Sequence, residues 1–249
     1  MSLLRARGLT VTFGGVHAVH AVDLDVAAGE LVGLIGPNGA GKTTLIDALT
    51  GFVRPSAGSV ELDGEDLTPL APAARAQRGL VRTFQSLELF EDLTVADNLR
   101  VCAETPHWWD PLVDAVRPRR GEALEQVGWA LEVVGLGDVA DRRPNELSHG
   151  RRKLVAVARA LALRPRVVLL DEPAAGLDTS ETARLGEHLR TLPEHGVSVL
   201  LVDHDMGLVL STCDRVAVLD VGAVIATGPP EQIRADHRVI EAYLGVAPA

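Results

Sequence analysis

The stretch Gly36-Pro37-Asn38-Gly39-Ala40-Gly41-Lys42-Thr43 follows an apolar segment, Leu31–Ile35, and leads into a segment with helical periodicity, Lys42–Thr50. It matches the pattern G-x-x-x-x-G-K-[ST] in the strand–loop–helix context that this pattern requires. Glycines let backbone N–H groups turn inward around phosphate oxygens, and the helix directs the positive end of its dipole at the same oxygens. The stretch therefore predicts a loop that binds nucleotide phosphates, in a fold that combines strands and helices.

Within this loop, we expect Lys42 to neutralise charge on the β- and γ-phosphates and the Thr43 hydroxyl to bind Mg²⁺. Lysine occurs only at positions 42 and 153 of the 249 residues, so its place here is informative. The structural alternative is an ordinary tight turn, which does not require the full eight-residue match. Further contacts to the nucleotide are expected from Asn38, Gly39, Ala40, Gly41 and Thr44.

A second acidic motif follows the apolar strand pattern at residues 167–170, which ends in Asp171 and Glu172. A buried strand of a parallel sheet places such carboxylates at the sheet edge where nucleotides bind. We expect Asp171 to hold Mg²⁺ and Glu172 to act as the general base that polarises the attacking water. A polar strand end meeting solvent is the alternative, and the phosphate-binding loop elsewhere in the chain argues against it.

Composition limits the classes of protein to consider. Hydrophobic residues make up 47% of the chain and the net charge is −10, which suits a globular core and argues against nucleic-acid binding. No stretch approaches 18 consecutive apolar residues, and the start of the chain lacks a secretion pattern. Cys102 and Cys213 lack metal-site spacing, so we expect free thiols in a reducing compartment.

The order of patterns predicts an α/β fold with a mostly parallel sheet and helices on both faces. Strand patterns alternate with helical patterns, except between residue 86 and about residue 164, where helical patterns replace strands. We therefore divide the chain into residues 1–85, with the phosphate-binding loop, a helical insertion at 86–164, and a second part of the core at 165–249. The last part is expected to end in two short helices.

At this point the chain resembles the ATPase family of ABC transporters over nearly its whole length. Leu147-Ser148-His149-Gly150-Arg151 looks like the signature loop of the family, usually L-S-G-G-Q, although His149 and Arg151 depart from it. Ser148 is able to cap the following helix and to face an anion with it. The resemblance implies a head-to-tail dimer in which Ser148 and Gly150 of one subunit face the ATP held by the other.

Three more positions carry the resemblance. Gln85 matches the glutamine that senses Mg²⁺ and the attacking water, and Asp178, in Ala175-Gly176-Leu177-Asp178, matches a loop along the dimer interface. Asp178 also suits the first turn of a helix, and the two roles are compatible. His204 follows an apolar strand pattern and matches the histidine that contacts the γ-phosphate and supports Glu172.

The adenine base is expected to stack on an aromatic residue early in the chain. Phe13 is the only Phe, Tyr or Trp before Gly36, and Val19 could pack on the same ring. A core role for Phe13 is the alternative.

Several segments narrow the resemblance to the ATPase subunits of branched-chain amino acid importers. These segments are Arg82-Thr83-Phe84-Gln85, residues 87–99, residues 204–209 and residues 239–245. Urea-type importers and the ATPase of lipopolysaccharide export are close neighbours, and substrate choice belongs to other chains.

The resemblance implies the ABC ATPase form of the P-loop NTPase fold, with a mostly parallel core sheet, an antiparallel β subdomain and a helical insertion. It also implies ATP and Mg²⁺ as cofactors, membrane-spanning subunits and a second ATPase subunit, identical or paralogous, as partners, and a place on the cytoplasmic face of the cell membrane. Three rivals stay open: a soluble ABC-type ATPase of DNA or ribosomes, a P-loop phosphotransferase, and a regulatory module without turnover.

Overall fold

A computed structural model describes residues 2–84, 88–103 and 120–244. An antiparallel sheet with the strand order β2-β1-β4-β5 comes from the first part of the chain. Its strands are β1 (Ser2–Phe13), β2 (Val16–Ala27), β4 (Ala57–Leu62) and β5 (Glu65–Asp66). Apolar and polar residues roughly alternate along the two long strands, as in strands with one buried face.

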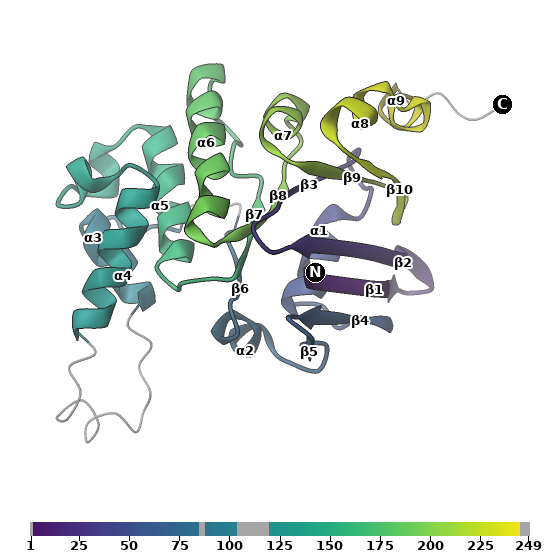
Figure 1. Ribbon diagram of the computed structural model, residues 1–249, viewed down its shortest axis with the longest axis horizontal. Helices are drawn as coiled ribbons and strands as arrows, with labels where there is room; N and C mark the ends of the chain where they lie inside the picture. Colours follow the sequence, from purple (N-terminus) through teal and green to yellow (C-terminus); the bar gives the residue numbers. More distant parts are fainter. Residues whose placement is uncertain (1, 85–87, 104–119, 245–249) are drawn as a thin grey trace.

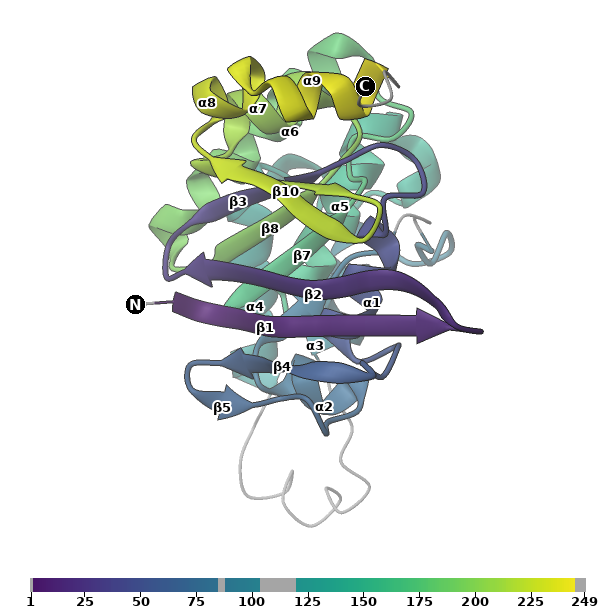
Figure 2. The ribbon, with the colours of Figure 1, turned by 90° about the vertical axis from the view of Figure 1, so that its right-hand side faces the viewer.

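The second sheet has the order β10-β9-β3-β8-β7-β6, and its neighbours pair in parallel except for β10, which runs antiparallel to β9. Its strands are β3 (Leu31–Ile35), β6 (Leu80–Arg82), β7 (Val167–Asp171), β8 (Ser198–Val202), β9 (Arg215–Asp220) and β10 (Ala223–Gly228). The mostly parallel core sheet is thus confirmed. Figure 2 shows the antiparallel sheet in front of it.

Helices cover the parallel sheet and form a separate group at one end of the molecule. The helices are α1 (Lys42–Thr50), α2 (Pro72–Gln77), α3 (Val95–Ala103), α4 (Arg120–Val133), α5 (His149–Leu161), α6 (Thr179–Thr191), α7 (Met206–Thr212), α8 (Pro230–Ala235) and α9 (His237–Leu244). Short 3₁₀ turns occur at Gly137–Val139, Pro144–Glu146 and Leu192–His195. Figure 1 shows α3, α4 and α5 together at the end away from the antiparallel sheet. These three helices fall within the insertion predicted at residues 86–164; the boundaries of the three segments stay a prediction.

Both faces of the parallel sheet are buried, because successive residues of a strand point to opposite sides. In β3, Leu31 and Ile35 belong to a core shared with the helical group, whereas Val32 and Leu34 belong to a core shared with α1 and the antiparallel sheet. Each such side chain stabilises the fold by about 1.5–3 kcal/mol when it is fully buried. This two-sided burial explains why the strands read as continuous apolar runs.

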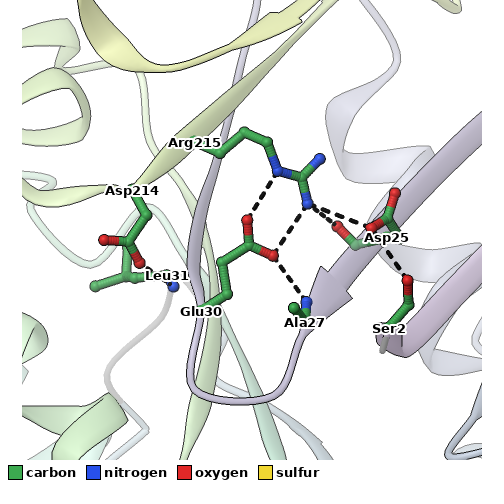
Figure 3. Close-up of polar contacts among 7 residues, drawn as sticks. All are labelled: Ser2, Asp25, Ala27, Glu30, Leu31, Asp214 and Arg215. Atoms are coloured by element: carbon green, nitrogen blue, oxygen red, sulfur yellow. Dashed lines mark hydrogen bonds and ion pairs between the residues drawn. The ribbon is translucent and has the colours of Figure 1, made fainter.

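A polar network joins the two sheets at the base of β3 (Figure 3). Arg215 at the start of β9 donates to Glu30 Oε1 at 2.8 Å, to Glu30 Oε2 at 3.0 Å and to the carbonyl of Asp25 in β2 at 2.7 Å. The N–H of Ala27 donates to Glu30 Oε2 at 2.7 Å. Burial raises the pKa of Glu30, but the bonds from Arg215 and Ala27 outweigh burial and leave that pKa below its usual value.

Among the strands and α-helices of the described residues, β5 and α2 were not anticipated. Helix α2 spans only six residues, too few for a clear period, and it is fixed by Arg75, whose side chain is buried. Arg75 donates to the carbonyls of Ala48 and Leu49 at the end of α1, and to those of Thr68 and Leu70. The helix therefore depends on a tertiary contact rather than on its own periodicity.

Candidate active site

The phosphate-binding loop connects the end of β3 to the start of α1, as predicted. Gly41 precedes α1 with φ 101°, and a Cβ there would stand 2.3 Å from the carbonyl oxygen of Ala18 in β2. Only glycine fits both this backbone conformation and this close approach. In the rest of the loop, Asn38, Gly39 and Thr43 are exposed, Thr44 is half-buried and Ala40 is buried.

Lys42 is held over its own loop. Its Nζ donates to the carbonyl of Gly36 at 2.6 Å and to that of Pro37 at 3.0 Å, and the side chain is largely buried. Burial lowers the pKa of Lys42, while the nearby carboxylates of Glu172 and Asp171 act in the opposite direction. The fold therefore brings the loop lysine and both predicted carboxylates into one electrostatic site.

Asp171 is the last residue of β7, and Glu172 follows it with φ 47°, an uncommon backbone conformation for a non-glycine residue. The N–H of Glu172 donates to the carbonyl of Val202 at the end of β8 at 2.7 Å. This bond fixes the turn after the strand, and such local strain often accompanies functional sites. One carboxylate oxygen of Asp171, Oδ2, accepts from Arg82 Nη2 at 2.8 Å.

His204 lies beside Glu172, with 4.0 Å between Nδ1 and Glu172 Oε2, and its side chain is 60% exposed. Asp203 lies just before it, with Oδ1 3.6 Å from the same ring nitrogen. Asp203 is fully buried and accepts from the N–H groups of Ala174 and Asp205 at 3.1 and 2.9 Å. These bonds hold the segments after β7 and β8 together, and so set the place of His204 relative to Glu172.

Sequence reasoning missed Asp203, Lys153 and Arg82. Lys153 on α5 is buried, which lowers its pKa, and the carboxylates of Asp203 and Glu172 oppose that effect. Asp203 carried a usable signal, because an acidic residue directly after a buried strand is the argument that we applied to Asp171. No local pattern assigned Lys153 or Arg82 to the site, because the carboxylates near them come from other segments of the chain.

Ser148 caps α5, as predicted, and its Oγ accepts from the N–H of Arg151 at 3.3 Å. Asp178 caps α6 and accepts from the N–H groups of Ser180 and Glu181 at 2.8 and 2.9 Å. The bond from the Glu181 N–H, followed by that from the Ser180 side chain, lowers the pKa of Asp178. The cap at Ser148 was predicted, whereas Asp178 was expected as an acid in the first turn of a helix and instead caps α6. The roles of Ser148 and Asp178 at a dimer interface stay predictions.

His149 and Arg151, which depart from the usual signature loop, both contact other residues of the same chain. The His149 ring lies against Gly176, where a Cβ would stand 3.1 Å from His149 Nε2. Arg151 Nη1 forms an ion pair with Asp138 at 3.0 Å, so part of its charge is compensated away from any phosphate. Gly150 N–H donates to Glu181 Oε1 at 3.1 Å, which links the signature loop to the start of α6.

The three other predicted site residues have different placements. Phe13 is 53% exposed at the end of β1, so its ring is available for stacking. Val19 in β2 is fully buried in the core next to α1. Gln85 lies outside the described residues. Contact of these residues with a nucleotide stays a prediction.

Comparison with known proteins identifies the family. The family model described as "ABC transporter" matches residues 19–175. The "High-affinity branched-chain amino acid transport ATP-binding protein BraF" of Pseudomonas aeruginosa is 43% identical over 252 residues, which cover 98% of each chain.

The chain belongs to the ABC transporter ATP-binding proteins. The model described as "Branched-chain amino acid ATP-binding cassette transporter" matches residues 223–249 of this ABC ATPase, the segment that begins with β10. The crystal structure of the ADP conformation of MJ1267, an ATP-binding cassette of an ABC transporter, has a TM-score of 0.86 and 32% identity over 98% of this chain and 99% of that one. A dimeric structure of MJ0796, a bacterial ABC transporter cassette, has a TM-score of 0.72 and 27% identity over 91% and 98%.

The site of this ABC ATPase suits Mg²⁺ bound together with phosphates. Mg²⁺ usually takes one or two oxygen ligands from the protein, and its other ligands are phosphate oxygens and waters. The Thr43 hydroxyl at the start of α1 and the Asp171 carboxylate at the end of β7 offer oxygens of this kind. Among the residues that the structure describes, no group of three or more His, Cys, Asp or Glu side chains could hold a metal by itself. The donor set thus fits an ion that depends on its nucleotide.

No helix in the described parts of the chain is both long enough and apolar enough to cross a membrane.

Proposed function

We propose that this chain binds and hydrolyses ATP to drive the import of branched-chain or other hydrophobic amino acids through separate membrane subunits. The observation that carries the proposal is the meeting of Lys42, Asp171, Glu172 and His204 at one edge of the parallel sheet. The likeness to BraF over 98% of both chains supports the choice of solute.

In this proposal, the site residues have defined roles in hydrolysis. Lys42 binds the β- and γ-phosphates, and Thr43 and Asp171 would hold Mg²⁺, which neutralises charge on the same phosphates when bound. Glu172 accepts a proton from the attacking water, and His204 beside it contacts the γ-phosphate and keeps Glu172 in place. Gln85 would sense the same water and metal.

The second half of each ATP site would come from another ATPase subunit. Ser148 and Gly150 stand at the N-terminal end of α5, where the positive end of the helix dipole favours an anion. The dimer of MJ0796 supports such pairing in a related cassette. We propose a head-to-tail dimer with either a second copy or a paralogous chain. In this dimer, Asp178 lies along the interface.

We propose that a groove beside β6 binds the membrane subunit. Its lining includes Phe84, Cys102, Arg159 and Leu163, and it measures about 230 Å³. The ring of Phe84 is 49% exposed and meets the exposed ring of Phe52 edge-on at 5.5 Å. A membrane subunit that covers these rings would hold the chain at the cytoplasmic face of the cell membrane.

The test is phosphate release by the purified chain, alone and with its membrane subunits, with Glu172→Gln and Ser148→Arg alongside. We expect Glu172→Gln to retain ATP and lose nearly all turnover, and Ser148→Arg to lose turnover by blocking the second half-site. Normal hydrolysis by Glu172→Gln would disprove the catalytic-base assignment. A labelled acceptor instead of free phosphate would favour a P-loop phosphotransferase.

Uptake measurements with membrane vesicles that contain the assembled complex decide the solute. Leucine uptake that depends on Glu172 supports the proposal. Uptake of urea, or export of lipopolysaccharide, would assign the chain to a neighbouring branch of the same family.

A further inference from the structure

Arg82, the last residue of β6, joins the two halves of the expected metal site. Its Nη1 donates to Asp47 Oδ1 in α1 at 2.5 Å, and its Nη2 donates to Asp171 Oδ2 at the end of β7 at 2.8 Å. The side chain of Arg82 is only 7% exposed and that of Asp171 12%. Charge-assisted bonds between such shielded groups are stronger and less screened than surface ion pairs.

Asp47 connects this pair of bonds to Thr43, because both residues belong to α1. Thr43 and Asp47 are four residues apart in α1, so they lie on the same face of the helix, about one turn from each other. Arg82 bonds to both Asp47 and Asp171, and so links the helix that carries Thr43 to the strand that ends in Asp171. Thr43 and Asp171 are the two side chains that would hold Mg²⁺.

The guanidinium plane is itself held by two rings. Its central carbon stands 5.2 Å from the centroid of Phe84 and 5.8 Å from that of Phe52. Arginine is able to stack on aromatic rings and bind two carboxylates at once, whereas the single ammonium of lysine offers no such fork. The arrangement therefore depends on an arginine and not only on a positive charge.

We propose that Arg82 is a positioning residue for the metal site, an inference that rests on the proposed function. It holds the Asp171 carboxylate at a fixed distance from Thr43, and its charge restrains metal affinity by occupying Asp171 Oδ2. Removal of Arg82 then has two opposite effects. The metal binds more tightly, because a competing cation is gone, and hydrolysis slows, because Asp171 is no longer held in place.

The experiment compares Arg82→Met and Arg82→Lys with wild type. The contribution of Mg²⁺ to nucleotide binding is measured as the dissociation constant of fluorescent mant-ADP in EDTA divided by its dissociation constant in excess Mg²⁺. This measurement requires no turnover. In Arg82→Met we expect this ratio to rise at least about threefold, because a positive charge close to the metal is lost, while kcat falls. In Arg82→Lys the ratio stays near that of wild type, because the charge is kept, while kcat still falls.

The control is Arg78→Met, which removes an exposed arginine paired with Glu65 at 2.5 Å, and should change neither quantity. A ratio in Arg82→Met that is unchanged or lower would overturn the proposal. If circular dichroism shows that this variant does not fold, Arg82→Lys decides, and a wild-type kcat there would overturn it. A wild-type chain, assembled with its membrane subunits and its second ATPase subunit, that binds mant-ADP with a Mg²⁺-dependent ratio but releases no phosphate would instead contradict the proposed function.

Discussion

Replacement of Arg215 by methionine should destabilise the junction between the two sheets (Figure 3). The change keeps the aliphatic part of the side chain and removes the bonds to Glu30 and to the Asp25 carbonyl. Glu30, with only 17% of its side chain exposed, then keeps a charge that lacks its arginine. Because hydrogen bonds to charged groups contribute about 1.5–3 kcal/mol and the site is partly solvated, we expect a loss of about 2–3 kcal/mol at pH 7.

The pH dependence follows from the lowered pKa of Glu30. A carboxyl whose pKa is lower in the folded state stabilises the fold above its unfolded pKa, about 4.3, and loses that contribution as the pH falls through the folded pKa. The difference between wild type and Arg215→Met should therefore be full at pH 7 and shrink in acid below about pH 4.

Urea unfolding at several pH values measures this difference, with the slope m unchanged between variants. Arg238→Met is the control, because Arg238 forms an exposed ion pair with Asp236 at 2.7 Å, and its loss should leave stability unchanged at pH 7. A loss below about 0.5 kcal/mol for Arg215→Met would refute the reasoning, as would a loss that stays constant down to pH 3.

Two more variants test the site. Gly41→Ala would force a Cβ to within 2.3 Å of the Ala18 carbonyl oxygen at φ 101°, which costs about 1–3 kcal/mol of strain. The affinity for mant-ADP should therefore fall at least about fivefold. The control variant Gly137→Ala, where a Cβ meets open space, should bind mant-ADP normally. Equal affinity in both variants would contradict the close approach. Asp203→Asn replaces one of the two carboxylate oxygens, which accept from the N–H groups of Ala174 and Asp205, by an NH₂ group that cannot accept. This change should lower the free energy of unfolding by about 1–3 kcal/mol. It should also slow ATP hydrolysis, because His204 is displaced. Unchanged unfolding and turnover in this variant would mean that Asp203 does not hold the site.

The sequence by itself determined the features that depend on neighbours along the chain. The glycine pattern and the apolar strand before it located the phosphate-binding loop, because a strand–turn–helix around phosphate restricts residue types at fixed spacings. Ser148 was predicted as a helix cap for a similar reason, since a cap bonds to N–H groups two or three residues later. The continuous apolar runs of β3, β7 and β8 indicated a sheet buried on both faces.

Only the tertiary structure decided which side chains from distant segments meet. Arg75 fixes α2 against the end of α1, Asp203 joins the segments after β7 and β8, and Arg82 links α1 to β7. Such pairs leave no period or local spacing in the sequence, because their geometry exists only once the sheet has assembled. The sequence therefore predicted what the site contains, and the folded chain decided how its charges are held.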